Sequence, residues 1–142
     1  MITRVKTIHT PGLSVRQQVL FEAAVPAGFP SPAADYEQDT LDLNELLVRN
    51  PPATFFVRVT GDSMTGAGIH HGDLLVVDRS FEPRDKSVVI AILNGELTVK
   101  RIRIKAGKIT LEPENHNYSS RQVTPDTEFE VWGVVTSAIH KL

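Results

Sequence analysis

Ser63 and Lys100 are the two residues whose types and settings could support covalent catalysis. Ser63 lies in the turn sequence GDSMTGAG, and Lys100 lies in the β-rich run ELTVKRIRI. A serine hydroxyl is a weak nucleophile until a neighbouring group accepts its proton, and a lysine amine can do so in a serine–lysine pair. The separation of 37 residues (100 − 63) allows two adjacent strands to bring them together. Ser63 is therefore a candidate nucleophile and Lys100 a candidate general base.

The surroundings of Lys100 follow from a predicted hairpin. The runs SVVIAIL and ELTVKRIRI are joined by Asn94-Gly95, a dipeptide typical of a two-residue type I′ turn. In this register Val89 pairs with Lys100, and Lys100 shares a face with four residues, whereas Arg101 and Arg103 point the other way. The residues on that face are Val89, Ala91, Thr98 and Ile102.

The sequence allows two interpretations of Lys100. Its stem can lie across apolar surface while the ammonium reaches water. Alternatively, the amine is desolvated, and burial then lowers its pKa from the usual value of about 10.4. Only the second interpretation yields a neutral amine that can act as a base near neutral pH.

The turn that carries Ser63 is rich in glycine. Gly61, Gly66 and Gly68 keep it open, so the backbone N–H groups of Ser63 and Met64 are candidate donors to a developing oxyanion. Asp62 favours the turn itself. The neighbouring His70-His71 pair is read as a polar turn pair, because no third metal ligand accompanies it.

The elements that must position these residues are mostly strands. From residue 54 onward, β-rich runs alternate with turn sequences, and they read TFFVRVT, DLLVVD, SVVIAIL, ELTVKRIRI, KITLE and EFEVWGVVTSAIH. Trp132 in the last run is expected in the core or at a dimer interface. The predicted fold class is mainly β.

One short helix is predicted ahead of the strands, in DTLDLNELLVRNPP. Asp42 and Glu45 have the spacing of a capping box, and Leu43, Leu46 and Leu47 fall on one helical face. Two turns are too few for a stable isolated helix, so this leucine stripe should dock on something. The preceding VPAGFPSPAAD reads as an extended arm, because its prolines exclude a helix.

Composition narrows the class of protein. The 142 residues suit one compact domain, and the net charge of −2 gives no electrostatic case for nucleic acid or an anionic membrane as the main partner. The absence of cysteine excludes disulfides, thiolate metal sites and a cysteine nucleophile. No apolar stretch approaches membrane-spanning length. We expect a cytoplasmic protein without cofactor or metal.

Several of these motifs together resemble one known family. GDSM, then GIHHGDLLVVDRS, then ELTVKR are similar to the self-cleaving serine–lysine peptidases related to the LexA repressor, and above all to the UmuD family of translesion-polymerase accessory proteins. AGFPSPAADY, LDLNELLVRNPPATFFVRVTGDSM and VWGVVT extend the likeness over most of residues 27–142. Residues 1–24 match no pattern of the family, and PRDKSVVIA stands where a Gly-Asp pair is expected before the strand.

The resemblance implies a LexA/UmuD-like β-rich peptidase domain with an extended N-terminal arm. Residues 1–27 would be a pro-segment removed by cleavage of the Ala27-Gly28 bond, residues 28–50 the arm and short helix, and residues 51–142 the peptidase domain. Ser63 would be the nucleophile and Lys100 the general base. The inducer would be a RecA–single-stranded DNA filament, and the processed homodimer would assist a UmuC-type Y-family polymerase in the SOS response.

Three other functions make different demands on the chain. A non-catalytic β-rich adaptor would use the arm to bind partners, with Ser63 as a turn residue only. A LexA-like repressor would need a DNA-binding domain before the cleavage site, and 27 residues are too few for a domain that folds unaided. A signal peptidase with a similar pair would need a membrane anchor.

Overall fold

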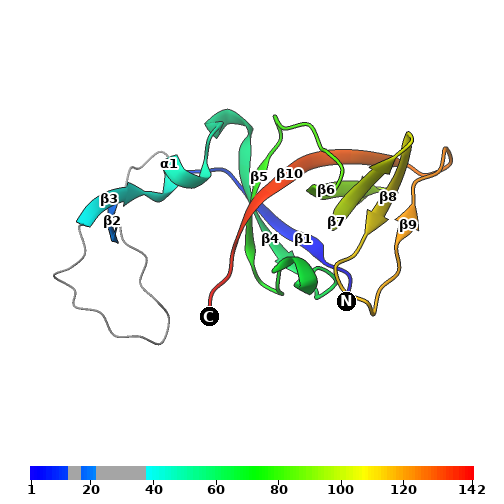
Figure 1. The fold of residues 1–142 in the computed structure, drawn as a ribbon, viewed down its shortest axis with the longest axis horizontal. Helices are drawn as coiled ribbons and strands as arrows, with labels where there is room; N and C mark the ends of the chain where they lie inside the picture. Colours follow the sequence, from blue (N-terminus) through cyan, green and yellow to red (C-terminus); the bar gives the residue numbers. More distant parts are fainter. Residues whose placement is uncertain (13–16, 22–37) are drawn as a thin grey trace.

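The computed structural model describes residues 1–12, 17–21 and 38–142, so the predicted cleavage site Ala27-Gly28 lies outside the described residues. The elements are mostly strands (Figure 1). The strands are β1 Arg4–His9, β2 Gln17–Phe21, β3 Gln38–Asp42, β4 Thr54–Thr60, β5 Leu74–Asp78, β6 Val88–Leu93, β7 Glu96–Lys105, β8 Lys108–Glu112, β9 Arg121–Gln122 and β10 Phe129–Ile139. The helical elements are α1 Leu43–Leu47 and two 3₁₀ turns, η2 Pro51–Ala53 and η3 Thr65–Ala67.

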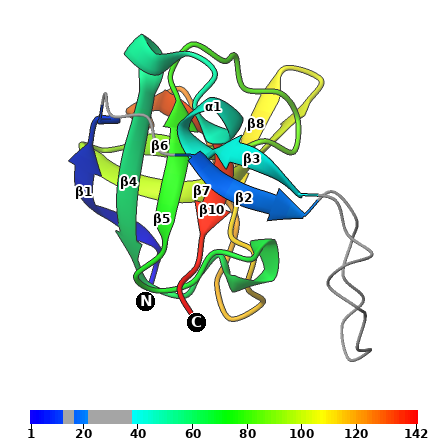
Figure 2. The same ribbon diagram turned by 90° about the vertical axis from the view of Figure 1, so that its left-hand side faces the viewer.

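The main sheet closes on itself. Its strand order is β1-β4-β5-β10-β6-β7-β8-β9, and β1 also pairs with β7 through Arg4 and Thr98. This second pairing joins β1, β4, β5, β10, β6 and β7 into a barrel (Figure 2). β8 pairs with β7, and β9 pairs with β8, so these two strands continue the sheet beyond the barrel (Figure 1). The predicted mainly β class is confirmed.

The predicted hairpin is confirmed in its register. Val89 lies opposite Lys100, and Leu93 lies opposite Glu96. The two turn residues have the positive φ angles of a type I′ turn, 48° for Asn94 and 83° for Gly95.

Two apolar clusters form the core, and β6 and β7 contribute to both because successive side chains alternate between faces. One cluster holds Met64, Ile90 and Val99 together with residues of β4 and β5. The other holds Val89, Ala91, Leu93, Ile102, Leu111 and Val134. Trp132 packs against the first cluster, with its ring edge-on to Phe55 at a centroid distance of 5.3 Å and Arg79 over its face.

The short helix forms where the sequence predicts it. The Asp42 carboxylate caps it by accepting the Asn44 backbone N–H at 2.9 Å. The helix ends at Leu47, and the prolines that follow form η2. On the leucine stripe, Leu43 and Leu46 stay about half exposed. Figure 1 shows α1 between the barrel and the two-stranded β2–β3 sheet.

The strand β1 is an element of the barrel that the sequence does not predict. It pairs antiparallel with β4 over five residue pairs, from Arg4 opposite Thr60 to His9 opposite Phe56. Its side chains are mostly exposed, and only Val5 packs against the core. Apolar alternation is therefore weak in RVKTIH, although backbone pairing makes it part of the barrel.

Candidate active site

Ser63 lies in the turn between β4 and η3 and is fully buried. Gly61 before it and Gly68 after it have φ angles of 100° and 79°, which a side chain disfavours. The Ser63 carbonyl accepts the Glu114 backbone N–H at 2.8 Å, and the Gly66 N–H donates to the Glu114 carbonyl at 2.7 Å. These two bonds fix the turn against the segment that follows β8.

The Ser63 hydroxyl has a backbone partner from the start of the chain. The Thr3 backbone N–H donates to Ser63 Oγ at 2.7 Å, and Thr3 is itself fully buried. The candidate nucleophile is thus covered by the residue that leads into β1.

Lys100 is 7% exposed, so its side chain does not extend into solvent. Its face of β7 is lined by Val89, Ala91 and Ile102, as predicted, and all three are buried. No hydrogen bond or ion pair joins its amine to another residue within the described ranges 1–12, 17–21 and 38–142. Desolvation by burial lowers the pKa of Lys100 below its ordinary value of 10.5. Of the two interpretations, the structure favours the desolvated amine.

Thr3 connects the turn that carries Ser63 with β7, the strand that carries Lys100. Its N–H bonds Ser63 Oγ, while its carbonyl accepts from Thr98 Oγ1 at 3.0 Å and from the Val99 N–H at 3.1 Å. Thr98 and Lys100 are two residues apart on one strand and so share a face. Within the described residues, however, no hydrogen bond joins Ser63 to Lys100 directly.

The candidate oxyanion donors are uncommitted. Neither the Ser63 nor the Met64 backbone N–H donates to another residue in the part of the chain that the structure describes. The Met64 carbonyl, by contrast, accepts from Ala67 at 3.0 Å and from Ile69 at 3.2 Å. The Met64 side chain is fully buried in the first core cluster, which anchors the turn.

Comparison with known proteins shows the family to which the chain belongs. The peptidase S24-like family model matches residues 19–136. The chain is 51% identical over 122 residues to protein SamA of Salmonella typhimurium, covering 86% of this chain and 84% of that protein. It is 46% identical over 116 residues to protein MucA of Escherichia coli, covering 81% and 79%.

The chain belongs to the peptidase S24-like family. A LexA repressor, from Paracidovorax citrulli, is 37% identical over 129 residues, which are 91% of this chain and 57% of the repressor. The relatives named SamA, ImpA and MucA confirm the resemblance to the UmuD family. No helix in the described residues is long and apolar enough to cross a membrane.

Asp62, next to the candidate nucleophile, has more partners than a turn residue needs. Its carboxylate accepts from the Met1 ammonium at 2.8 Å and from the Tyr118 hydroxyl at 2.5 Å. Its carbonyl accepts from Asn115 Nδ2 at 2.9 Å. The hydrogen bond from the Met1 ammonium is the main cause that lowers the Asp62 pKa, and the bond to Asp62 raises the pKa of Tyr118. The sequence alone does not indicate these long-range partners.

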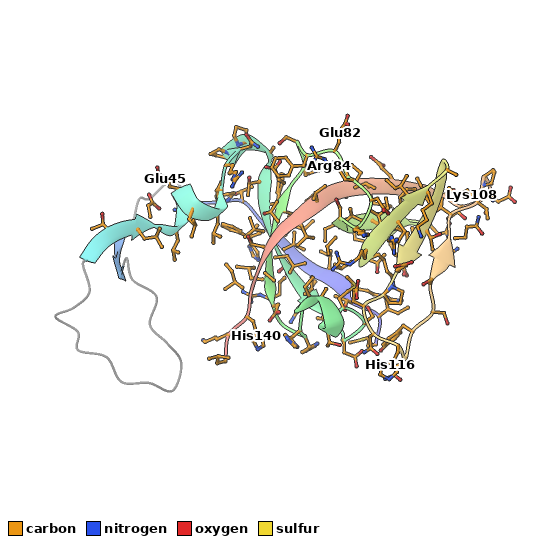
Figure 3. All side chains as sticks on the ribbon, viewed as in Figure 1. Glu45, Glu82, Arg84, Lys108, His116 and His140 are labelled. Carbon is orange, nitrogen blue, oxygen red and sulfur yellow. The ribbon has the colours of Figure 1, made fainter. Side chains whose placement is uncertain are left out.

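The histidines do not gather into a metal site. His71 Nδ1 accepts the Gly61 backbone N–H at 3.1 Å, and His140 Nδ1 lies 2.6 Å from a carboxylate oxygen of Asp73. Figure 3 shows His140 after β10 and His116 in the segment after β8. No three potential metal-ligating side chains come together among the described residues.

The basic residues near Lys100 on β7 form ion pairs on the opposite face. Arg101 pairs with Glu114, and Arg103 Nε lies 3.1 Å from Asp85. These pairs agree with the prediction that both arginines point away from Lys100.

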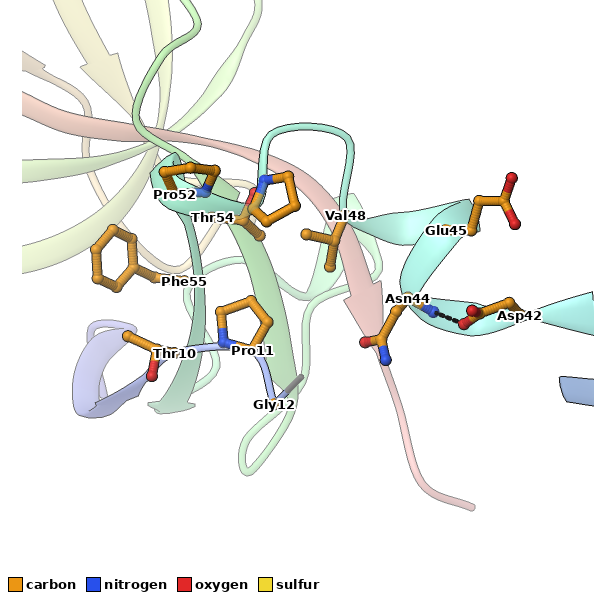
Figure 4. A pocket seen from close by; sticks show the side chains of 11 residues that line it. Thr10, Pro11, Gly12, Asp42, Asn44, Glu45, Val48, Pro52, Thr54 and Phe55 are labelled. Carbon is orange, nitrogen blue, oxygen red and sulfur yellow. Dashed lines mark hydrogen bonds between the residues drawn. The ribbon is translucent and has the colours of Figure 1, made fainter. Parts of the chain in front are cut away.

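A pocket of about 570 Å³ lies away from Ser63 (Figure 4). It is formed by the chain after β1, the first turn of α1 and the start of β4, including Pro11, Glu45 and Phe55. Ser63 follows the other end of β4, and a strand of seven residues spans about 20 Å. None of the candidate catalytic residues lines this pocket.

Proposed function

We propose that this protein is a serine endopeptidase that cleaves its own Ala27-Gly28 bond, with Ser63 as nucleophile and Lys100 as general base. The observation that carries the proposal is the setting of Lys100. Lys100 is 7% exposed and has no charge partner among the described residues, so its charged form would destabilise the fold and its neutral form is favoured. A neutral amine can accept the proton of the Ser63 hydroxyl, which makes the serine a nucleophile. Membership of the peptidase S24-like family supports the proposal of a peptidase reaction.

The proposed reaction proceeds in two steps. Lys100 Nζ takes the proton of the Ser63 hydroxyl as Oγ attacks the Ala27 carbonyl carbon, and the carbon–nitrogen bond to Gly28 then breaks. The Lys100 ammonium returns the proton to the leaving Gly28 amine, which leaves an ester between Ala27 and Ser63. Water, deprotonated by Lys100, then hydrolyses the ester and restores the hydroxyl.

The uncommitted backbone amides of Ser63 and Met64 suit the tetrahedral intermediate of this reaction. Donors that already point at the developing negative charge stabilise it without reorganisation, and removing one such donor typically costs about 10²- to 10³-fold in rate. Glycine at position 66 allows the turn that holds these donors to pack closely against Glu114, because an added Cβ would lie 2.6 Å from the Glu114 carbonyl oxygen.

The proposed biological role follows the UmuD relatives. Cleavage is stimulated by a RecA–single-stranded DNA filament in the cytoplasm, and the processed homodimer assists a UmuC-type Y-family polymerase during the SOS response. Because the scissile bond belongs to the same chain or to its dimer partner, its effective concentration is high and little substrate affinity is needed. Stimulation then acts by favouring the docked conformation.

The test is self-cleavage followed by intact-protein mass. Purified protein is incubated at alkaline pH, and separately at neutral pH with a RecA–single-stranded DNA filament. We expect a fragment beginning at Gly28 from the wild type and from Lys105→Ala, an exposed lysine on the same strand. Ser63→Ala and Lys100→Ala should give none. Cleavage by either variant at the wild-type rate would contradict the assignment.

One observation favours a second candidate, a non-catalytic adaptor. Leu43 and Leu46 on α1 are 49% and 55% exposed, which suits a docking surface for another protein. If the wild type yields no fragment in either incubation, the adaptor is the remaining function.

A further inference from the structure

We propose that β1 is a pseudo-substrate strand: residues 1–9 occupy the groove between β4 and β7 that the scissile segment must enter, and so hold the peptidase inactive. The inference rests on the proposed function and states how the proposed self-cleavage would be regulated. It is carried by the contacts of Thr3 and by the pairing of β1.

The position of β1 is that of a bound extended peptide. It adds to the edge of β4, the strand that leads into Ser63, and its first residue also pairs with Thr98 on β7, the strand of Lys100. A strand that adds to a sheet edge is a common way for a protein to bind an extended peptide. β1 therefore lies between β4, which leads into the Ser63 turn, and β7, which carries Lys100.

The contacts continue past β1 to the nucleophile itself. Thr3 donates to Ser63 Oγ and accepts from β7, and the Met1 carbonyl accepts the Asp62 N–H at 2.9 Å. Gly61 has room for this segment only because it lacks a side chain: an added Cβ would lie 2.5 Å from the Ile2 carbonyl oxygen. The turn and the first three residues are closely fitted.

The chemistry at the nucleophile is that of an inhibitor and not of a substrate. A substrate presents a carbonyl carbon to Ser63 Oγ, whereas Thr3 presents an amide N–H at 2.7 Å. That bond uses a lone pair of the oxygen that must attack. The sequence around Thr3, MITRV, also differs from the VPAGF around the predicted scissile bond. β1 thus fills the site in a pose that cannot be cut.

The consequence is a competition within one chain. The scissile segment docks only in the fraction of molecules from which β1 has left, so the cleavage rate falls in proportion to that fraction. Cleavage at Ala27-Gly28 would remove residues 1–27, and with them β1, which frees the edge of β4 in the product.

The test locks β1 in place with a reversible cross-link. Arg4 and Thr60 are directly paired residues on neighbouring antiparallel strands, whose Cα spacing suits a disulfide, and the natural chain has no cysteine. In the Arg4→Cys/Thr60→Cys variant, we expect the oxidised protein not to cleave itself at alkaline pH, and dithiothreitol to restore cleavage. The wild type with dithiothreitol is the matched control. Equal rates for the oxidised and reduced forms would overturn the proposal.

A pair of substitutions at Thr3 gives a second measurement. Thr3→Pro removes the N–H that bonds Ser63 Oγ and should raise the rate roughly 2- to 12-fold, the range for one lost hydrogen bond. Thr3→Val keeps that N–H and removes a buried hydroxyl that has no described partner, so it should cleave no faster than the wild type. If Thr3→Pro is not faster than Thr3→Val, β1 does not inhibit.

These experiments distinguish failure of the proposed inhibition by β1 from failure of the proposed peptidase function. If the wild type yields the Gly28 fragment but neither the cross-link nor Thr3→Pro changes its rate, the peptidase assignment stands and the inhibitory role of β1 fails. If no form of the protein yields the fragment, both fail.

Discussion

Replacement of Lys100 by methionine tests whether its amine is truly desolvated. Methionine keeps most of the side-chain length and apolar contact with Val89, Ala91 and Ile102, but removes the ionisable group. Leaving a buried polar group without a partner costs about 1–3 kcal/mol, and a charged group costs more. We therefore expect Lys100→Met to raise the free energy of unfolding by at least about 1 kcal/mol at pH 7.

This gain should depend on pH in one direction. Burial lowers the pKa of Lys100 in the folded state below the value of 10.5 that it has when exposed. Between those two pKa values the unfolded chain binds more protons than the folded chain, so the wild type gains stability as pH rises. The charge penalty is full at low pH, and it disappears above the unfolded pKa. The advantage of Lys100→Met should shrink accordingly.

Urea unfolding at pH 7 and at pH 11 measures this, in a Ser63→Ala background that prevents self-cleavage. Lys105→Met is the matched control, because Lys105 is exposed on the same strand and should show little difference at either pH. A Lys100→Met variant that is less stable than its parent at pH 7, or whose advantage is the same at both pH values, would refute the reasoning.

Other predictions concern the fold around the site. Lys86 has a φ of 74°, in the left-handed region that favours glycine, so Lys86→Gly should raise the free energy of unfolding by up to about 1 kcal/mol in urea; a loss would contradict it. Gly133→Ala should destabilise the barrel by about 1–3 kcal/mol, because its Cβ would lie 2.6 Å from Val77 Cγ1, and an unchanged urea midpoint would contradict this. Ile102→Ala should cost about 2–5 kcal/mol by the same measurement. A loss under about 1 kcal/mol would show that the core beside Lys100 is loosely packed.

The strands and the hairpin could be predicted because their signals are local. Asn94-Gly95 fixes one turn and one register, and that register alone places Lys100 among Val89 and Ala91. The strands β4 to β8 and β10 can likewise be recognised in the sequence as apolar runs. In each of them, one face or both faces pack against the core, so apolar residues alternate or follow one another.

The placement of the first nine residues could not be predicted in this way. β1 is held mainly by backbone hydrogen bonds to β4, and these leave no pattern in the side chains. The Thr3 bond to Ser63 Oγ and the Met1 bond to Asp62 join residues about 60 positions apart. Such contacts depend on the closure of the barrel, which composition and periodicity do not specify.

The pH dependence of self-cleavage tests the central claim most directly. If the neutral amine of Lys100 takes the proton of Ser63, the rate should rise about tenfold per pH unit and then level off at a pH below 10.5, since burial lowers the Lys100 pKa. A rate that is independent of pH, or that keeps rising beyond pH 10.5 as hydroxide catalysis would, contradicts the account.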